Sequence, residues 1–83
     1  MPTVALMWEA KAAPGQGQAL LEWARSRELP TSPLRREHFT APGDRVLVIT
    51  WWEGSYDANV PELPEPAGDL IARAVHRWRF ERV

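Results

Sequence analysis

The chain of 83 residues contains no cysteine and only one lysine, and it has no long run of apolar or of basic residues. The lack of cysteine excludes disulfides, thiol nucleophiles and thiolate metal sites. No stretch approaches the roughly 20 apolar residues of a membrane span, and the start MPTVALMWEAK lacks the features of a secretory signal. We therefore expect a cytoplasmic protein that makes no contact with a membrane.

Neither positive nor negative charge dominates the sequence, since the formal net charge is -1 and the pI is about 6.1. Proteins that bind nucleic acid usually carry a basic patch, so we expect no nucleic-acid partner. The sequence has no glycine-rich phosphate loop, no Gly-x-Ser-x-Gly elbow and no HExxH zinc motif. These absences predict that the protein uses no metal and no cofactor.

The stretch VLVITWWEG, residues 46–54, is apolar on both faces of the strand that it predicts. Successive side chains of a strand point to opposite faces of the sheet. Two apolar sets therefore result, with Val46, Val48 and Trp52 on one face and Leu47, Ile49 and Trp51 on the other. Residues 3–11 repeat this arrangement, with Val4, Leu6 and Trp8 opposed to Ala5 and Met7. Both strands thus need apolar cover on two faces.

Six elements are expected along the chain. They are a strand at 3–11, a helix at 18–29, strands at 34–40 and 46–54, a helix at 69–75 and a strand at 76–83. The first helix is predicted by an apolar stripe around Leu20 and Trp23, and the second by Ile71 and Val75, which lie one turn apart. The charged strand at 34–40 and the half-polar strand at 76–83 suit the edges of a sheet.

This order, βαββαβ, predicts a single ferredoxin-like α+β domain over residues 1–83. Its four-stranded antiparallel sheet would have both helices on one face and the first and third strands at its centre. Two helices cover only one face, so the second apolar face needs another surface. We predict a homodimer joined through that face. The sequence leaves open which face this is, and the weaker apolar content of Ala5 and Met7 makes their side the easier one to fit against a second sheet.

The residues resemble a known family, the dimeric α+β barrel superfamily of antibiotic-biosynthesis-type monooxygenase-like proteins. The resemblance is carried by the turn APGQGQALLEWA into the first helix and by VLVITWWEG, a hydrophobic third strand that ends in Trp52 and Glu53. It implies two sheets packed face to face, with a small cavity between each sheet and its own helices. The chain departs from the family in its short second helix and at Thr50, where an acidic residue is common.

Three side chains are candidates for catalysis: His38, Tyr56 and His76. Neither histidine stands in a recognisable acid-base or metal-ligand spacing, and His76 lies where the expected second helix gives way to the last strand, so that the helix dipole would favour a charged imidazole cap there. The candidate ligand-binding residues are Trp8, Trp52 and Tyr56, which could line a pocket for a flat molecule. The alternative for each residue is a structural role, since tryptophan is equally suited to cores and interfaces.

Three functions stay open on the sequence. We favour a small dimeric protein that binds a small hydrophobic or aromatic ligand or a protein partner. The alternative is a cofactor-independent monooxygenase-like enzyme acting on an aromatic or polyketide-type compound, as the resemblance implies. An RNA-binding module is the third, because aromatic residues on the central strands of ferredoxin-like domains stack on bases. Net acidity opposes this third function.

Overall fold

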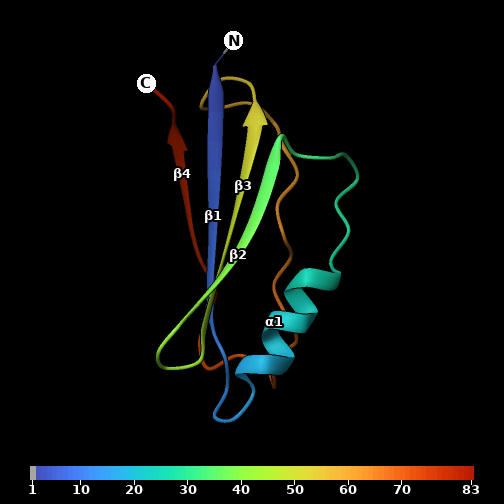
Figure 1. Cartoon of the computed structure of the whole chain (residues 1–83), viewed down its shortest axis with the longest axis vertical. Helices are drawn as coiled ribbons and strands as arrows, with labels where there is room; N and C mark the ends of the chain where they lie inside the picture. Colours follow the sequence, from blue (N-terminus) through green and yellow to red (C-terminus); the bar gives the residue numbers. More distant parts are fainter. Residues whose placement is uncertain (1) are drawn as a thin grey trace.

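A four-stranded antiparallel sheet is the main element of the fold, as a computed structural model that describes residues 2–83 shows (Figure 1). Its strands are β1 (Thr3–Lys11), β2 (Arg35–Ala41), β3 (Arg45–Glu53) and β4 (His76–Glu81). They lie side by side in the order β2-β3-β1-β4. The α+β class, the antiparallel sheet and the central position of the first and third strands are thus confirmed.

The two central strands pair over their whole length, from Thr3 opposite Glu53 to Lys11 opposite Arg45. Buried and partly exposed side chains alternate along both of them. The buried set is Val4, Leu6, Trp8 and Ala10 on β1 and Val46, Val48, Thr50 and Trp52 on β3. The side of the sheet that carries Ala5 and Met7 lies outside the core. The expected two-faced pattern is therefore present in the fold.

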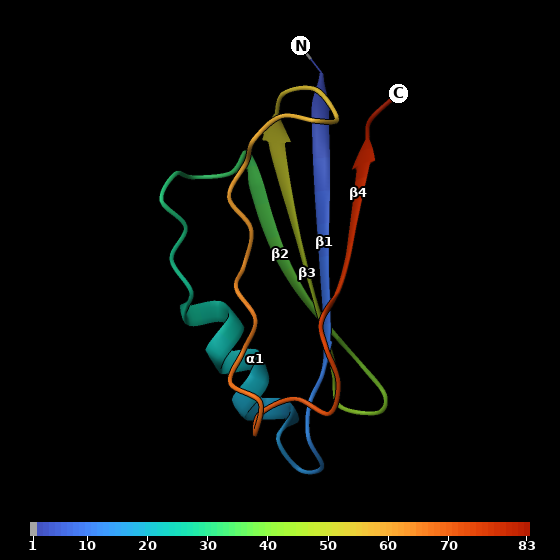
Figure 2. The ribbon, with the colours of Figure 1, turned by 180° about the vertical axis from the view of Figure 1, so that it is seen from behind.

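The inner face is covered by one helix and by a long extended segment. Helix α1 (Gly17–Ser26) buries Leu20 and Ala24 against the sheet. The chain from residue 54 to residue 75, which we call the strap, runs back along the same side of the sheet as α1 and passes in front of α1 in the view of Figure 2. Leu63 of the strap belongs to the same buried cluster as Leu20.

The predicted second helix at 69–75 is wrong, and so is the order βαββαβ. Ile71 instead forms an antiparallel bridge with Ala12. The backbone N–H of Ala13 donates to the carbonyl of Leu70 at 3.0 Å, and that of Ala72 donates to a carbonyl at the end of β1 at 2.8 Å. Backbone groups of residues 70 and 72, which a helix would use for its own hydrogen bonds, are therefore bonded to the end of β1 and to the residues directly after it. Within residues 2–83 the order is βαβββ, with a single α-helix.

Prolines and length explain why the second helix does not form. Pro61, Pro64 and Pro66 hold the first part of the strap extended, because proline disfavours the helical conformation in the residue before it. The seven residues of the predicted helix, 69–75, are too few for a stable helix without strong packing. Ile71 and Val75 still pack against the core, so the apolar positions were identified correctly although their conformation was not.

Arginines of β4 attach the strap to the sheet. Arg77 Nη1 donates to the carbonyl of Leu63 at 2.7 Å, and Arg79 Nη1 donates to two carbonyls near the start of the strap at 2.7 and 2.8 Å. Trp8 contributes from β1, since its indole N–H donates to the carbonyl of Pro64 at 3.3 Å. The strap is therefore a structural layer of the domain.

If the strap is part of the core, truncating Leu63 should cost far more stability than truncating an exposed leucine. Leu63 is 4% exposed and Leu34 is 61% exposed. We expect Leu63→Ala to lower the free energy of unfolding by about 2–5 kcal/mol. The matched variant Leu34→Ala should change it by less than about 0.5 kcal/mol. Urea denaturation followed by tryptophan fluorescence measures both, and equal costs would contradict the assignment.

Candidate functional site

The face of the sheet opposite α1 and the strap is uncovered, and we call it the open face. The side chains that form it are Ala5, Met7, Leu47, Ile49 and Trp51 at the centre, Phe39 on β2, and Trp78 and Phe80 on β4. Phe39, Trp78 and Phe80 are 44%, 45% and 52% exposed. These apolar side chains come from all four strands, so one face of the sheet is largely apolar and has no covering segment within residues 2–83.

A charged cluster borders the open face at the end near the turn between β2 and β3. Arg73 Nη2 donates to the two carboxylate oxygens of Glu9 at 2.8 and 3.0 Å. His76 Nδ1 lies 3.6 Å from Oε1 of the same carboxylate, and its ring packs edge-on against Trp78. The predicted role of His76 as a helix cap is wrong, because β4 begins at this residue and no helix precedes it.

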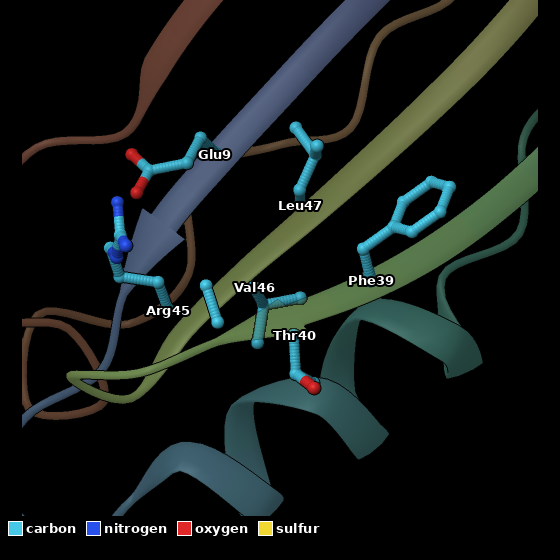
Figure 3. Close-up of a pocket in the computed structure, with 7 residues that line it drawn as sticks. Glu9, Phe39, Thr40, Arg45, Val46 and Leu47 are labelled. Carbon is cyan, nitrogen blue, oxygen red and sulfur yellow. The ribbon is translucent and has the colours of Figure 1, made fainter.

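A hollow of about 240 Å³ lies between this cluster and β2 (Figure 3). Its lining is mostly apolar and consists of Phe39, Ala41, Val46 and Leu47 with Thr40, and Glu9 and Arg45 form its polar end. In Figure 3, Arg45 reaches across the sheet toward Glu9, and Phe39 and Leu47 stand on the other side of the hollow. The hollow thus combines an apolar wall with a charged edge.

The turn Pro42-Gly43-Asp44 determines where this hollow forms. Gly43 and Asp44 have φ values of 84° and 58°, a left-handed conformation that glycine and aspartate tolerate better than other residues. This short connection places Phe39 directly opposite Leu47. Cross-strand neighbours on one face lie about 5 Å apart, so their side chains form one wall.

His38 lies on the inner side of β2, away from the open face. Arg36 Nε donates to His38 Nε2 at 3.3 Å, and the other guanidinium nitrogens of Arg36 donate to the carbonyls of Ala24 and Arg27 at the end of α1. Burial, followed by the positive charges of Arg36 and Arg25, lowers the pKa of His38. His38 is therefore held as a neutral acceptor that helps to join β2 to α1.

Trp8 and Trp52 are core residues, 3% and 6% exposed, and they belong to separate buried clusters. Trp8 stacks on Trp23 with ring centroids 6.0 Å apart, and Trp52 Nε1 donates to Thr50 Oγ1 at 2.9 Å. Tyr56 is half exposed in the loop after β3. The structure therefore does not bring the three predicted ligand-binding residues together, and large buried indoles occupy the space between the sheet and its cover.

Sequence reasoning missed the residues of the hollow. One signal was present, because the short turn at Pro42-Gly43-Asp44 indicates a hairpin and so places Phe39 near Leu47. The contact between Glu9 and Arg73 joins residues 64 positions apart. No local pattern could have indicated it, since Arg73 reaches β1 only through the path of the strap.

In comparisons with models of protein families, with curated proteins and with solved structures, nothing matches the chain. Over residues 2–83, no helix has both the length and the apolar content needed to cross a membrane. The same residues contain no group of three or more histidine, aspartate or glutamate side chains that could hold a metal ion.

The lowered pKa of His38 predicts how stability depends on pH. The unfolded chain, with a histidine pKa of about 6.5, binds more protons than the folded chain as the pH falls below that value, so the folded state loses stability on acidification. The variant His38→Gln keeps an acceptor for Arg36 and should show a smaller loss between pH 7 and pH 5. Urea denaturation at several pH values measures this difference. An NMR titration that gives His38 an ordinary or raised pKa would contradict the prediction.

Proposed function

We propose that the protein is a homodimer in which two open faces pack together, as in the dimeric α+β barrels, and that it binds a small hydrophobic or aromatic ligand at this interface. The observation that carries the proposal is the apolar open face itself. Its centre, Met7 and Ile49, pairs across the two strands that also form the core. The proposed function thus combines ligand binding with assembly.

The size of the open face supports a stable dimer. Strands of nine residues and a sheet of four strands give a face of roughly 30 by 19 Å from the usual strand dimensions. Two such faces would together bury on the order of 1,000 Å² if they were flat, and protruding side chains would add to this area. This is about the lower limit for a specific interface.

The charges at the borders of the open face are compatible with burial against a second copy. Glu9 is paired with Arg73 at one end, and Arg35 is paired with Glu37 at the other. The guanidinium of Arg35 also lies 5.5 Å from the ring centroid of Trp51. Glu9 and Glu37 thus have their counterions within the same chain, so that dimer formation leaves neither of these two carboxylates buried without a partner.

A second copy of the chain is a better cover for the open face than another segment of the same chain. The described residues already place α1 and the strap on the inner face, where they complete one core. A domain of this length buries only about 60% of the surface of its unfolded chain, so its stability benefits from a partner. A symmetric interface hides two copies of the apolar surface at once.

The positions of the three candidate catalytic residues also support binding. His38 lies on the inner side of β2, Tyr56 lies in the loop after β3, and His76 lies at the border of the open face. Acid and base groups that act on one substrate must lie within hydrogen-bond reach of the same reacting atoms. These three residues lie in different parts of the domain.

Light scattering at micromolar concentration tests the proposal. We expect the wild-type chain to have the mass of a dimer. Ile49→Lys places a charge at the centre of the open face and should give a folded monomer, because an unpaired charge is costly to bury. The control Ala19→Lys adds the same charge on an exposed position of α1 and should stay dimeric. A wild-type monomer would contradict the proposal.

A further inference from the structure

We infer that the hollow beside Phe39 and Leu47 is the ligand site, and that its ligand is a small aromatic carboxylate. The ring would lie against the apolar wall and the carboxylate would be bound by Arg45. The inference deepens the proposed function, since it names the ligand class and its position. The hollow itself is formed by a single chain, so the two ideas can fail separately.

The size and lining of the hollow favour an aromatic ring. Its volume is about 240 Å³, whereas an apolar cavity of about 150 Å³ is enough to hold benzene. One or two fused rings therefore fit. Phe39 is 44% exposed and offers its ring to a ligand, and aromatic pairs gain stability beyond the area that they bury. Leu47 and Ala41, whose side chains lie on the same face as Phe39, provide aliphatic contacts nearby.

The charges at the polar end favour an anionic group on that ring. Glu9 already binds both of its oxygens to Arg73. Arg45 donates through Nε to the carbonyl of Pro42 at 3.1 Å, which leaves its two terminal nitrogens for a ligand. Lys11 lies opposite Arg45 in the sheet register. Arg73, Arg45 and Lys11 thus share this end of the open face with the carboxylate of Glu9, and Glu37 farther along β2 is paired with Arg35.

A carboxylate is the anion that suits this geometry. The guanidinium of arginine is planar and presents parallel N–H groups that match the two oxygens of a carboxylate. A neutral ring would leave the excess positive charge without a partner, and a cationic ring would be repelled by it. In the proposed dimer the second open face would also exclude water from the hollow, which strengthens such a charged contact.

The test compares two ligands of nearly the same shape, naphthoate and its neutral analogue naphthamide. Each is titrated into the full chain and followed by calorimetry and by amide chemical shifts. We expect naphthoate to bind roughly tenfold tighter than naphthamide, the effect of one charged hydrogen-bonded contact. The shifts should centre on β2 and β3 around Phe39 and Leu47.

Three variants locate the site. Arg45→Gln should abolish the preference for naphthoate, and Phe39→Ala should weaken both ligands. The matched control is Arg82→Gln, which removes one positive charge at the opposite end of the open face, where Arg82 lines a different hollow. Urea denaturation of each variant shows that it is folded. Equal binding of the two ligands, no binding, or loss of the preference in Arg82→Gln instead of Arg45→Gln would each overturn the inference.

Light scattering on the same samples separates the two ideas. A dimer that binds neither ligand would overturn the ligand site and leave the proposed assembly standing. A monomer that binds naphthoate through Arg45 would support the ligand site and contradict the assembly.

Discussion

The antiparallel pairing of β1 with β3 is the constraint on which the rest of the structure depends. Its register places Trp8 opposite Val48 on the inner face and Met7 opposite Ile49 on the open face. Both faces of the central strands are apolar, so each needs cover. A chain of this length supplies one covering layer, α1 and the strap, and that layer completes the core. The open face follows from the same pairing, because within residues 2–83 both α1 and the strap lie on the inner face.

Alternation with a period of two was enough to predict the four strands, and the two strands that are apolar on both faces lie at the centre of the sheet, as expected. The second helix was mispredicted for a physical reason. Ile71 and Val75 are apolar and face the core, but both a short helix and an irregular extended chain can bring such residues to the same surface. The backbone decides between them, and here the hydrogen bonds between the strap and the end of β1 are formed instead of helical ones. Such long-range competition is not visible in the local spacing.

The candidate site shows the same limit. Parity indicated that one apolar set had to lie outside the core but left open which one, and in the structure it is the set that contains Ala5 and Met7. The large indoles of Trp8 and Trp52 were predicted to contact a ligand, but their size also makes them effective core residues, and both are buried. The hollow depends instead on residues from three segments, with Glu9 fixed by Arg73 of the strap. Its position could be known only once the register of the hairpin and the path of the strap were known.

Assembly and ligand binding, as proposed, use different parts of one surface. The hollow lies at the end of the open face near Arg45, whereas Met7 and Ile49 lie at its centre. A ligand in the hollow therefore leaves the apolar centre available to a partner. If the second open face closes over the ligand, the ligand binds the dimer more tightly than the monomer, and by thermodynamic linkage it must strengthen the dimer by the same factor. Glu9 connects the two processes, because its ion pair with Arg73 keeps the edge of the hollow from repelling a carboxylate and keeps the border of the interface neutral.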